Sequence, residues 1–192
     1  QCYSMRGLEA VAATNISSTI FNVFNVVYMA LGVAVGIVVG QKLGAGEMEE
    51  ARETDTRMIV FAVLSCLALG TLLFATAPLF PAIYNTTDEG RALATNLMRV
   101  SASFMPMYAF LHTCYYTLRS GGKTVITFFF DSGFIWVCSM PLAFCLARFT
   151  SVPLVTMYAL CQGIELIKCV IGFILVKKGV WIHNLVSRKE SA

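Results

Sequence analysis

Five long apolar stretches constrain this 192-residue chain more than any other feature. They lie at residues 10–41, 58–83, 93–117, 125–147 and 152–176. Each is long enough to cross a hydrocarbon core of about 30 Å as a helix, which needs about 20 residues. The strands of a membrane β-barrel would instead be about 10 residues long and would alternate in polarity. The chain is therefore predicted to be an all-α integral membrane protein with five transmembrane helices.

Composition argues against several other classes of protein. Charged residues make up 13% of the chain, about half the share found in soluble domains. The net charge of +3 is too small to attract nucleic acid, so no such partner is expected. The seven cysteines show no CxxC spacing, and the sequence carries no signature of a hydrolase, a nucleotide-binding loop or a metalloprotease. We therefore predict no enzyme activity, no catalytic residues, no metal site and no cofactor.

Lysine and arginine are distributed unequally between the two sides of the predicted bundle. One side carries nine of them: Lys42, Arg52, Arg57, Arg119, Lys123, Lys177, Lys178, Arg188 and Lys189. The other side carries three: Arg6, Arg91 and Arg148. Because cytoplasmic loops are enriched in positive charge, residues 177–192 are predicted to form a cytoplasmic tail. The first span then starts outside the cell, which predicts at least one helix upstream and makes residues 1–192 a partial bundle.

The outer half of the first span carries a polar stripe. Its members recur at i, i+3, i+7 and i+10 and so share one helix face. They are Asn15, Ser18, Asn22 and Asn25. Amides that face hydrocarbon cost several kcal/mol each, so this face must meet either another helix or water. Hydrogen bonding between helices and the lining of a water-filled cavity both fit, and the cavity is favoured because one helix contact needs fewer polar groups.

The inner half of the same span carries a repeated GxxxG pattern formed by Gly32, Gly36 and Gly40. Small residues at this spacing let a neighbouring helix approach closely. We predict a helix-packing surface here, which could also serve as a sliding surface.

Five ionisable residues fall inside the predicted spans, where charge is costly and each is a candidate site. Counted from the cytoplasmic ends of two antiparallel helices, Asp131 lies about 9 Å deep in the membrane and Lys168 about 12 Å deep. The two residues are therefore expected at similar depths. Glu165 precedes Lys168 by three residues and could share it. This group is either a structural charge cluster or a device for coupling or gating. His112 is a packing residue or a proton carrier, and Arg99 is expected to extend towards the membrane surface.

Four segments resemble, in order and spacing, the C-terminal half of the multidrug and toxic compound extrusion (MATE) transporters. They are "LEAVAATNIS" at 8–17, "VGQKLGAGEMEEA" at 39–51, "LRSGGKT" at 118–124 and "DSGFIWVCSMPLA" at 131–143. The resemblance implies two six-helix bundles around a substrate cavity, with Na⁺ or H⁺ exchanged for organic cations across the plasma membrane. It also implies that this chain supplies the last five of twelve helices and that a missing N-terminal bundle is its partner.

Two positions depart from the family pattern. Some branches of the family place a cation-binding acid on the third span, where this chain has Tyr108. The turn after that span often carries Asp, where this chain has Lys123. If a carboxylate couples ions, the resemblance places it in the missing half, with Asp131 and Glu165 as weaker local candidates.

The sequence thus predicts secondary active efflux of amphipathic organic cations and xenobiotics, coupled to Na⁺ or H⁺. Phe104, Tyr108 and Tyr115 are expected to add aromatic faces to the polar stripe of the first span in lining the cavity. Small amphipathic cations and the lipid bilayer are the expected partners. Two alternatives stay open. A lipid-linked oligosaccharide flippase would need a more cationic cavity, and in a non-transporting membrane scaffold the polar stripe would dock a partner helix.

Overall fold

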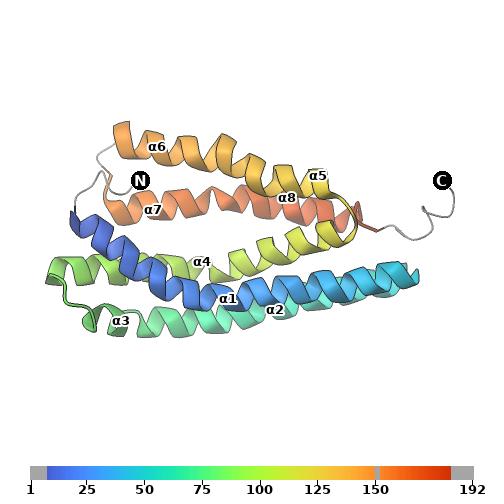
Figure 1. Cartoon of the computed structure of the whole chain (residues 1–192), viewed down its shortest axis with the longest axis horizontal. Coiled ribbons are helices and arrows are strands. Elements are labelled where there is room, and N and C mark those ends of the chain that lie inside the picture. Colours follow the sequence, from blue (N-terminus) through green and yellow to red (C-terminus); the bar gives the residue numbers. More distant parts are fainter. Residues whose placement is uncertain (1–7, 150–151, 183–192) are drawn as a thin grey trace.

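The computed structural model describes residues 8–149 and 152–182, and every regular element in them is a helix. The elements are α1 (Leu8–Ala45), α2 (Met48–Thr76), α3 (Leu79–Ala82), α4 (Asp88–Ser120), α5 (Thr124–Phe128), the π-helical turns η2 (Phe129–Gly133) and η3 (Ile135–Ser139), α6 (Met140–Phe149), α7 (Leu154–Gly163) and α8 (Glu165–Lys177). The predicted all-α class is confirmed for this part of the chain. Figure 1 shows the long helices side by side along one axis.

Four helical stretches in the described residues are long and apolar enough to cross a membrane. They are Glu9–Ala45, Met48–Thr76, Thr124–Phe149 and Leu154–Lys177. The chain is therefore a multi-pass membrane protein. The third predicted span, 93–117, does form a helix within α4, but α4 is not among the four.

The polarity of α4 follows from its central position. This helix packs against α1, α2, α5, α7 and α8, so much of its surface meets protein. Its Ser101, Thr113 and Thr117 are fully buried. The hydroxyls of Ser101 and Thr113 each donate a hydrogen bond to a carbonyl one turn earlier in the helix. A helix that is surrounded by other helices can carry more polar side chains than a helix that faces lipid. The prediction of five transmembrane helices, with α4 as one of them, therefore stays a prediction.

α1, α2 and α4 pack against one another, and the α7–α8 helix packs on α4 (Figure 1). The α5–α6 helix lies beyond α7–α8 in this view and contacts α4 through α5. The α5–α6 helix is the least covered, and large side chains such as Phe128, Trp136 and Val137 are more than half exposed. These side chains provide an apolar surface for lipid or for a neighbouring bundle.

The three GxxxG glycines of α1 lie against α4. A Cβ atom added at Gly32 would come within 2.8 Å of the Tyr116 ring, and one at Gly36 within 3.2 Å of it. At Gly40 the nearest atom would be the Ser120 Cβ at 3.7 Å. The α1–α4 contact is therefore close where the GxxxG pattern predicts a packing surface.

Basic residues gather where the structure brings three helix ends together. α1, α4 and α8 all end at one side of the bundle, with Lys42, Arg119 and Lys177 in their last turns (Figure 1). The opposite end carries Arg91 and Arg148, near the start of α4 and the end of α6. The assignment of lysine and arginine to alternate sides of the predicted spans gives the same grouping. The cytoplasmic location of the end with more basic residues stays a prediction.

Candidate functional site

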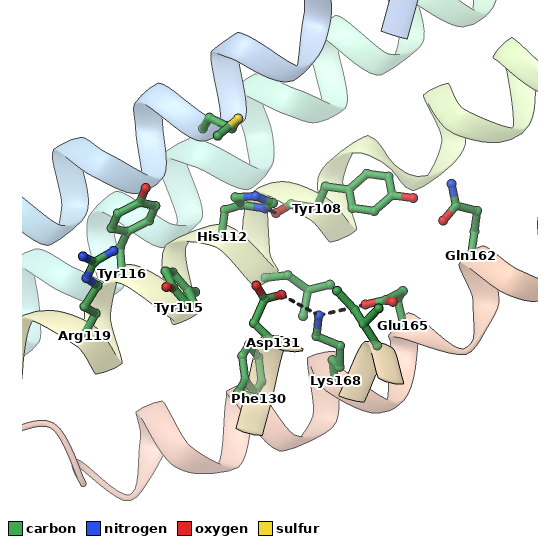
Figure 2. Close-up of a pocket in the computed structure, with 13 residues that line it drawn as sticks. Tyr108, His112, Tyr115, Tyr116, Arg119, Phe130, Asp131, Gln162, Glu165 and Lys168 are labelled. Atoms are coloured by element: carbon green, nitrogen blue, oxygen red, sulfur yellow. Dashed lines mark hydrogen bonds and ion pairs between the residues drawn. The ribbon is translucent and has the colours of Figure 1, made fainter. Parts of the chain in front are cut away.

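A pocket of about 360 Å³ lies between α1, α4, the π-helical turns, α7 and α8. Its lining comprises Met29, Tyr108, Leu111, His112, Tyr115, Tyr116, Arg119, Phe130, Asp131, Ile135, Gln162, Glu165 and Lys168. Figure 2 shows aromatic side chains of α4 on one wall and a charged group on the facing wall. We call this cavity the central pocket.

The charged wall is a group of three residues joined by ion pairs. The Lys168 Nζ lies 3.3 Å from the Asp131 Oδ1 and 3.1 Å from the Glu165 Oε2 (Figure 2). The side chain of Lys168 is 7% exposed, that of Glu165 14% and that of Asp131 50%. One buried ammonium therefore serves two carboxylates, and the more accessible carboxylate is Asp131. We call these residues the charge triad.

Further contacts hold the buried part of the triad in place. The Ser139 hydroxyl donates a hydrogen bond of 3.1 Å to the Glu165 Oε1. The rings of Phe130 and Phe134 have their centroids 5.6 Å and 5.7 Å from the Lys168 Nζ, within cation–π range. Both carboxylate oxygens of Glu165 thus have a partner. In the described contacts of Asp131, only the Oδ1 atom has a partner.

The π-helical turns set the position of Asp131. Between Thr124 and Phe149 the helix passes through two successive π-helical segments, and Asp131 sits within the first. A π-helical turn holds more residues than an α-helical turn and so rotates the side chains that follow it. Pro141 comes just after the second segment and has no N–H to donate, which weakens the regular α-helical ladder there.

The aromatic wall is built along one face of α4. The His112 Nδ1 lies 3.0 Å from the backbone oxygen of Tyr108, one turn earlier in the helix. Tyr28 of α1 packs behind both, with ring centroids 4.8 Å from His112 and 5.7 Å from Tyr108. Tyr115 and Tyr116 continue the wall with their rings 5.3 Å apart. Contacts from α1 therefore fix much of this wall before any ligand enters.

Six of the residues singled out in the sequence line the central pocket together. They are Tyr108, His112, Tyr115, Asp131, Glu165 and Lys168. Arg99 does not line it, because its guanidinium lies 5.4 Å from the ring centroid of Phe74 on the other side of α4. Phe104 is half-buried and also lies outside the lining.

The polar stripe of α1 lies outside the central pocket. Asn15, Ser18 and Asn22 are exposed, and Asn25 is half-buried with an Oδ1 that has no hydrogen-bond partner in the described structure. Met29, one turn after Asn25, does line the pocket. The stripe therefore leads along α1 towards the pocket, on a surface that the described helices leave open.

Sequence reasoning missed several lining residues. Gln162 precedes Glu165 by three positions and so shares its helix face. An amide on the charged face of a membrane helix could have indicated that Gln162 lines the pocket. Tyr116 and Arg119 extend the α4 face by one turn beyond Tyr115. Phe130 gave no such signal, because its position depends on the π-helical turn.

No cluster of three or more histidine, cysteine, aspartate or glutamate side chains in residues 8–149 and 152–182 has the geometry to hold a metal ion. The central pocket offers one half-exposed carboxylate, Asp131, beside a largely buried ammonium, Lys168.

Apolar helices long enough to cross a bilayer, around a charged and aromatic pocket, define the class of multi-pass membrane proteins. The comparison with known families makes the class specific. A family model described as MatE matches residues 2–145, three quarters of the chain. The chain belongs to the MatE family, the multidrug and toxic compound extrusion transporters, as its four motif segments suggested.

Individual relatives are named as multidrug extrusion or multidrug resistance proteins. Multidrug and toxin extrusion protein 2 of Mus musculus is 30% identical over 125 residues, which cover 64% of this chain and 22% of that protein. Multidrug and toxin extrusion protein 1 of Homo sapiens is 24% identical over 184 residues, 89% of this chain and 31% of that protein. Multidrug resistance protein MdtK of Edwardsiella ictaluri (strain 93-146) is 27% identical over 143 residues, 73% of this chain and 31% of that protein.

The chain thus spans less than a third of the length of these relatives. No solved structure matches it significantly.

Proposed function

We propose that the protein containing this chain exports amphipathic organic cations and other xenobiotics across the plasma membrane, in exchange for Na⁺ or H⁺. The observation that carries the proposal is the central pocket, in which a half-exposed carboxylate faces a wall of tyrosines. Aromatic faces and a carboxylate together suit lipophilic cations. The relatives' names, which refer to multidrug extrusion and multidrug resistance, support this choice of substrate class.

Asp131 is the exchangeable carboxylate of this proposal. Its side chain is 50% exposed and its described ion pair is with Lys168 alone, whereas Glu165 is 14% exposed and held by two partners. When a proton or a cation binds at Asp131, Lys168 keeps Glu165 as its counter-ion, so the pocket does not acquire an unpaired buried charge. His112, on the facing wall, is a second candidate for a coupled proton.

The rest of the transporter completes the cavity in this proposal. An N-terminal bundle covers the open polar stripe of α1, so that Asn15, Ser18 and Asn22 line the space between the two halves. Alternating access then moves this bundle against its partner, with the C-terminus on the cytoplasmic side.

Dye efflux from cells that express the intact protein tests the function, with Na⁺ and pH gradients imposed separately. Gradient-dependent efflux of a fluorescent organic cation is expected, and Asp131→Asn should lower its rate by about tenfold or more. Asp88→Asn is the matched control, because Asp88 is 98% exposed, pairs with Arg91 and lies outside the pocket. Absence of efflux under either gradient from a folded protein would overturn the function, and full efflux by Asp131→Asn would remove that residue from the coupling.

The flippase alternative needs a cationic pocket that could hold a pyrophosphate. Arg119 and Lys168 both line the central pocket, but the Lys168 ammonium is shared by two carboxylates. The charge triad therefore argues for cationic rather than anionic cargo.

A further inference from the structure

A second pocket, of about 490 Å³, lies between α2, α4 and α8, and it shares none of its lining residues with the central pocket. It is lined by Asp55, Arg52 and Lys177 together with apolar side chains such as Val60, Leu64 and Phe173. We call it the Asp55 groove. The three charged residues lie towards the end of the bundle where α1, α4 and α8 end.

Asp55 is a buried carboxylate that the protein satisfies on one side alone. The residue is 1% exposed, and its Oδ1 accepts a hydrogen bond of 2.5 Å from the Thr117 hydroxyl. Its Oδ2 is buried and has no hydrogen-bond partner in the described structure. A buried carboxylate oxygen without a hydrogen-bond donor is unfavourable. A molecule that occupies the groove and donates a hydrogen bond to this oxygen would remove the cost.

The rim of the groove carries charge of the opposite sign. Arg52 stands one turn before Asp55 on α2, and Lys177 lies in the last turn of α8. Neither forms a salt bridge within the residues that the structure describes, and the Lys177 Nζ lies 5.6 Å from the ring centroid of Phe173. The groove thus pairs one buried anion with two accessible cations, which is complementary to a zwitterion that contains an ammonium and a phosphate.

The remaining wall of the groove is apolar and open. Val60 is 52% exposed, Leu64 59% and Phe173 54%, and all three lie further along their helices from the charged end. A ligand with a zwitterionic head and a hydrocarbon chain can therefore bury its head near Asp55 and lay its chain along α2 and α8. A small organic cation would satisfy Asp55 but would meet repulsion from Arg52 and Lys177.

We propose that the Asp55 groove binds a phospholipid with a primary ammonium headgroup, as in phosphatidylethanolamine. The ammonium donates a hydrogen bond to the Asp55 Oδ2, the phosphate lies between Arg52 and Lys177, and an acyl chain follows Val60, Leu64 and Phe173. A choline headgroup does not substitute, because its quaternary nitrogen has no hydrogen to donate. This site is separate from the central pocket and does not depend on the proposed transport activity.

Native mass spectrometry of the intact protein in mild detergent tests the proposal, with phosphatidylethanolamine and phosphatidylcholine of identical acyl chains. The wild type should retain the ethanolamine lipid about tenfold better, as expected for one charge-assisted hydrogen bond. Asp55→Asn should abolish this preference. Lys177→Gln should weaken the retention of both lipids and leave their ratio unchanged.

Glu53→Gln is the matched control, because it neutralises a carboxylate of the same helix that is 64% exposed and lies outside the groove. It should leave the preference intact. Equal retention of the two lipids by the wild type would overturn the proposal, and so would a preference that survives in Asp55→Asn. The comparison of the two lipids on the wild type decides the matter even if Asp55→Asn does not fold.

Discussion

The central pocket contains a carboxylate that is 14% exposed, Glu165, and the Asp55 groove contains one that is 1% exposed, but the two carboxylates have different partners. In the central pocket Glu165 receives an ammonium from Lys168 and a hydroxyl from Ser139. In the groove the Asp55 Oδ1 accepts a hydrogen bond from the Thr117 hydroxyl, and its Oδ2 has no hydrogen-bond partner among residues 8–149 and 152–182. The first site is compensated from within the chain, whereas the second is left to be completed from outside.

This difference has a consequence for mutation. At a compensated site, removal of the compensating group leaves buried charge behind and is strongly destabilising. At an incomplete site, removal of the charge itself relieves a cost that the protein bears when no ligand is bound. The two sites should therefore respond in opposite directions to the loss of a charge.

Replacement of Lys168 by Met should give the largest effect. It leaves Asp131 and Glu165 together without their shared cation, and the loss of one partner from a buried pair costs about 3 kcal/mol or more. We expect a clear fall in the midpoint of thermal unfolding in detergent. Lys178→Met is the control, because Lys178 is exposed, and it should leave the midpoint unchanged.

A double variant distinguishes charge from packing at Lys168. If unpaired carboxylates cause the loss, then Lys168→Met combined with Glu165→Gln should recover part of the stability. A double variant no more stable than the single one would show that the aliphatic stem of Lys168, packed near Phe130 and Phe134, matters more than its charge.

Thr117→Val should have the next largest effect. It keeps the shape of the side chain but removes the hydroxyl that donates to Asp55, and a buried acceptor left without a donor costs about 2 kcal/mol. Thr113→Val is a close control, since Thr113 is also buried in α4 but its hydroxyl bonds to backbone oxygens of its own helix. Equal losses from the two variants, measured by thermal unfolding, would show that the bond to Asp55 adds nothing.

Much of the fold follows from apolar run length. The predicted span 125–147 lies within the continuous helix Thr124–Phe149, and the span 10–41 lies within α1. The matched depths of Asp131 and Lys168 also anticipate their proximity, because depth depends on the axial rise of a helix alone. The roles proposed for these residues stay predictions.

Asp55 was missed because the predicted second span begins at 58, whereas α2 begins at Met48. A signal was present, since Asp55, Ile59, Ala62 and Cys66 recur at helical spacing and all four are buried. Hydropathy fails at such a helix end because charged residues on the exposed face outweigh the buried face. The π-helical turns gave no signal that a pattern of period 3.6 could detect.

The smallest effect is expected from Asp55→Asn, and it is the one that separates the two sites most directly. In detergent without phospholipid, loss of the unpaired charge should raise the unfolding free energy by about 1 kcal/mol or less, the opposite of the response at Lys168. Added phosphatidylethanolamine should stabilise the wild type, because a ligand that binds the folded state shifts the unfolding equilibrium, and it should stabilise Asp55→Asn much less. Thermal unfolding with and without the lipid measures both quantities. If Asp55→Asn is less stable than the wild type without lipid and gains as much from the lipid, then Asp55 is a compensated structural residue like Glu165, and the contrast between the two sites disappears.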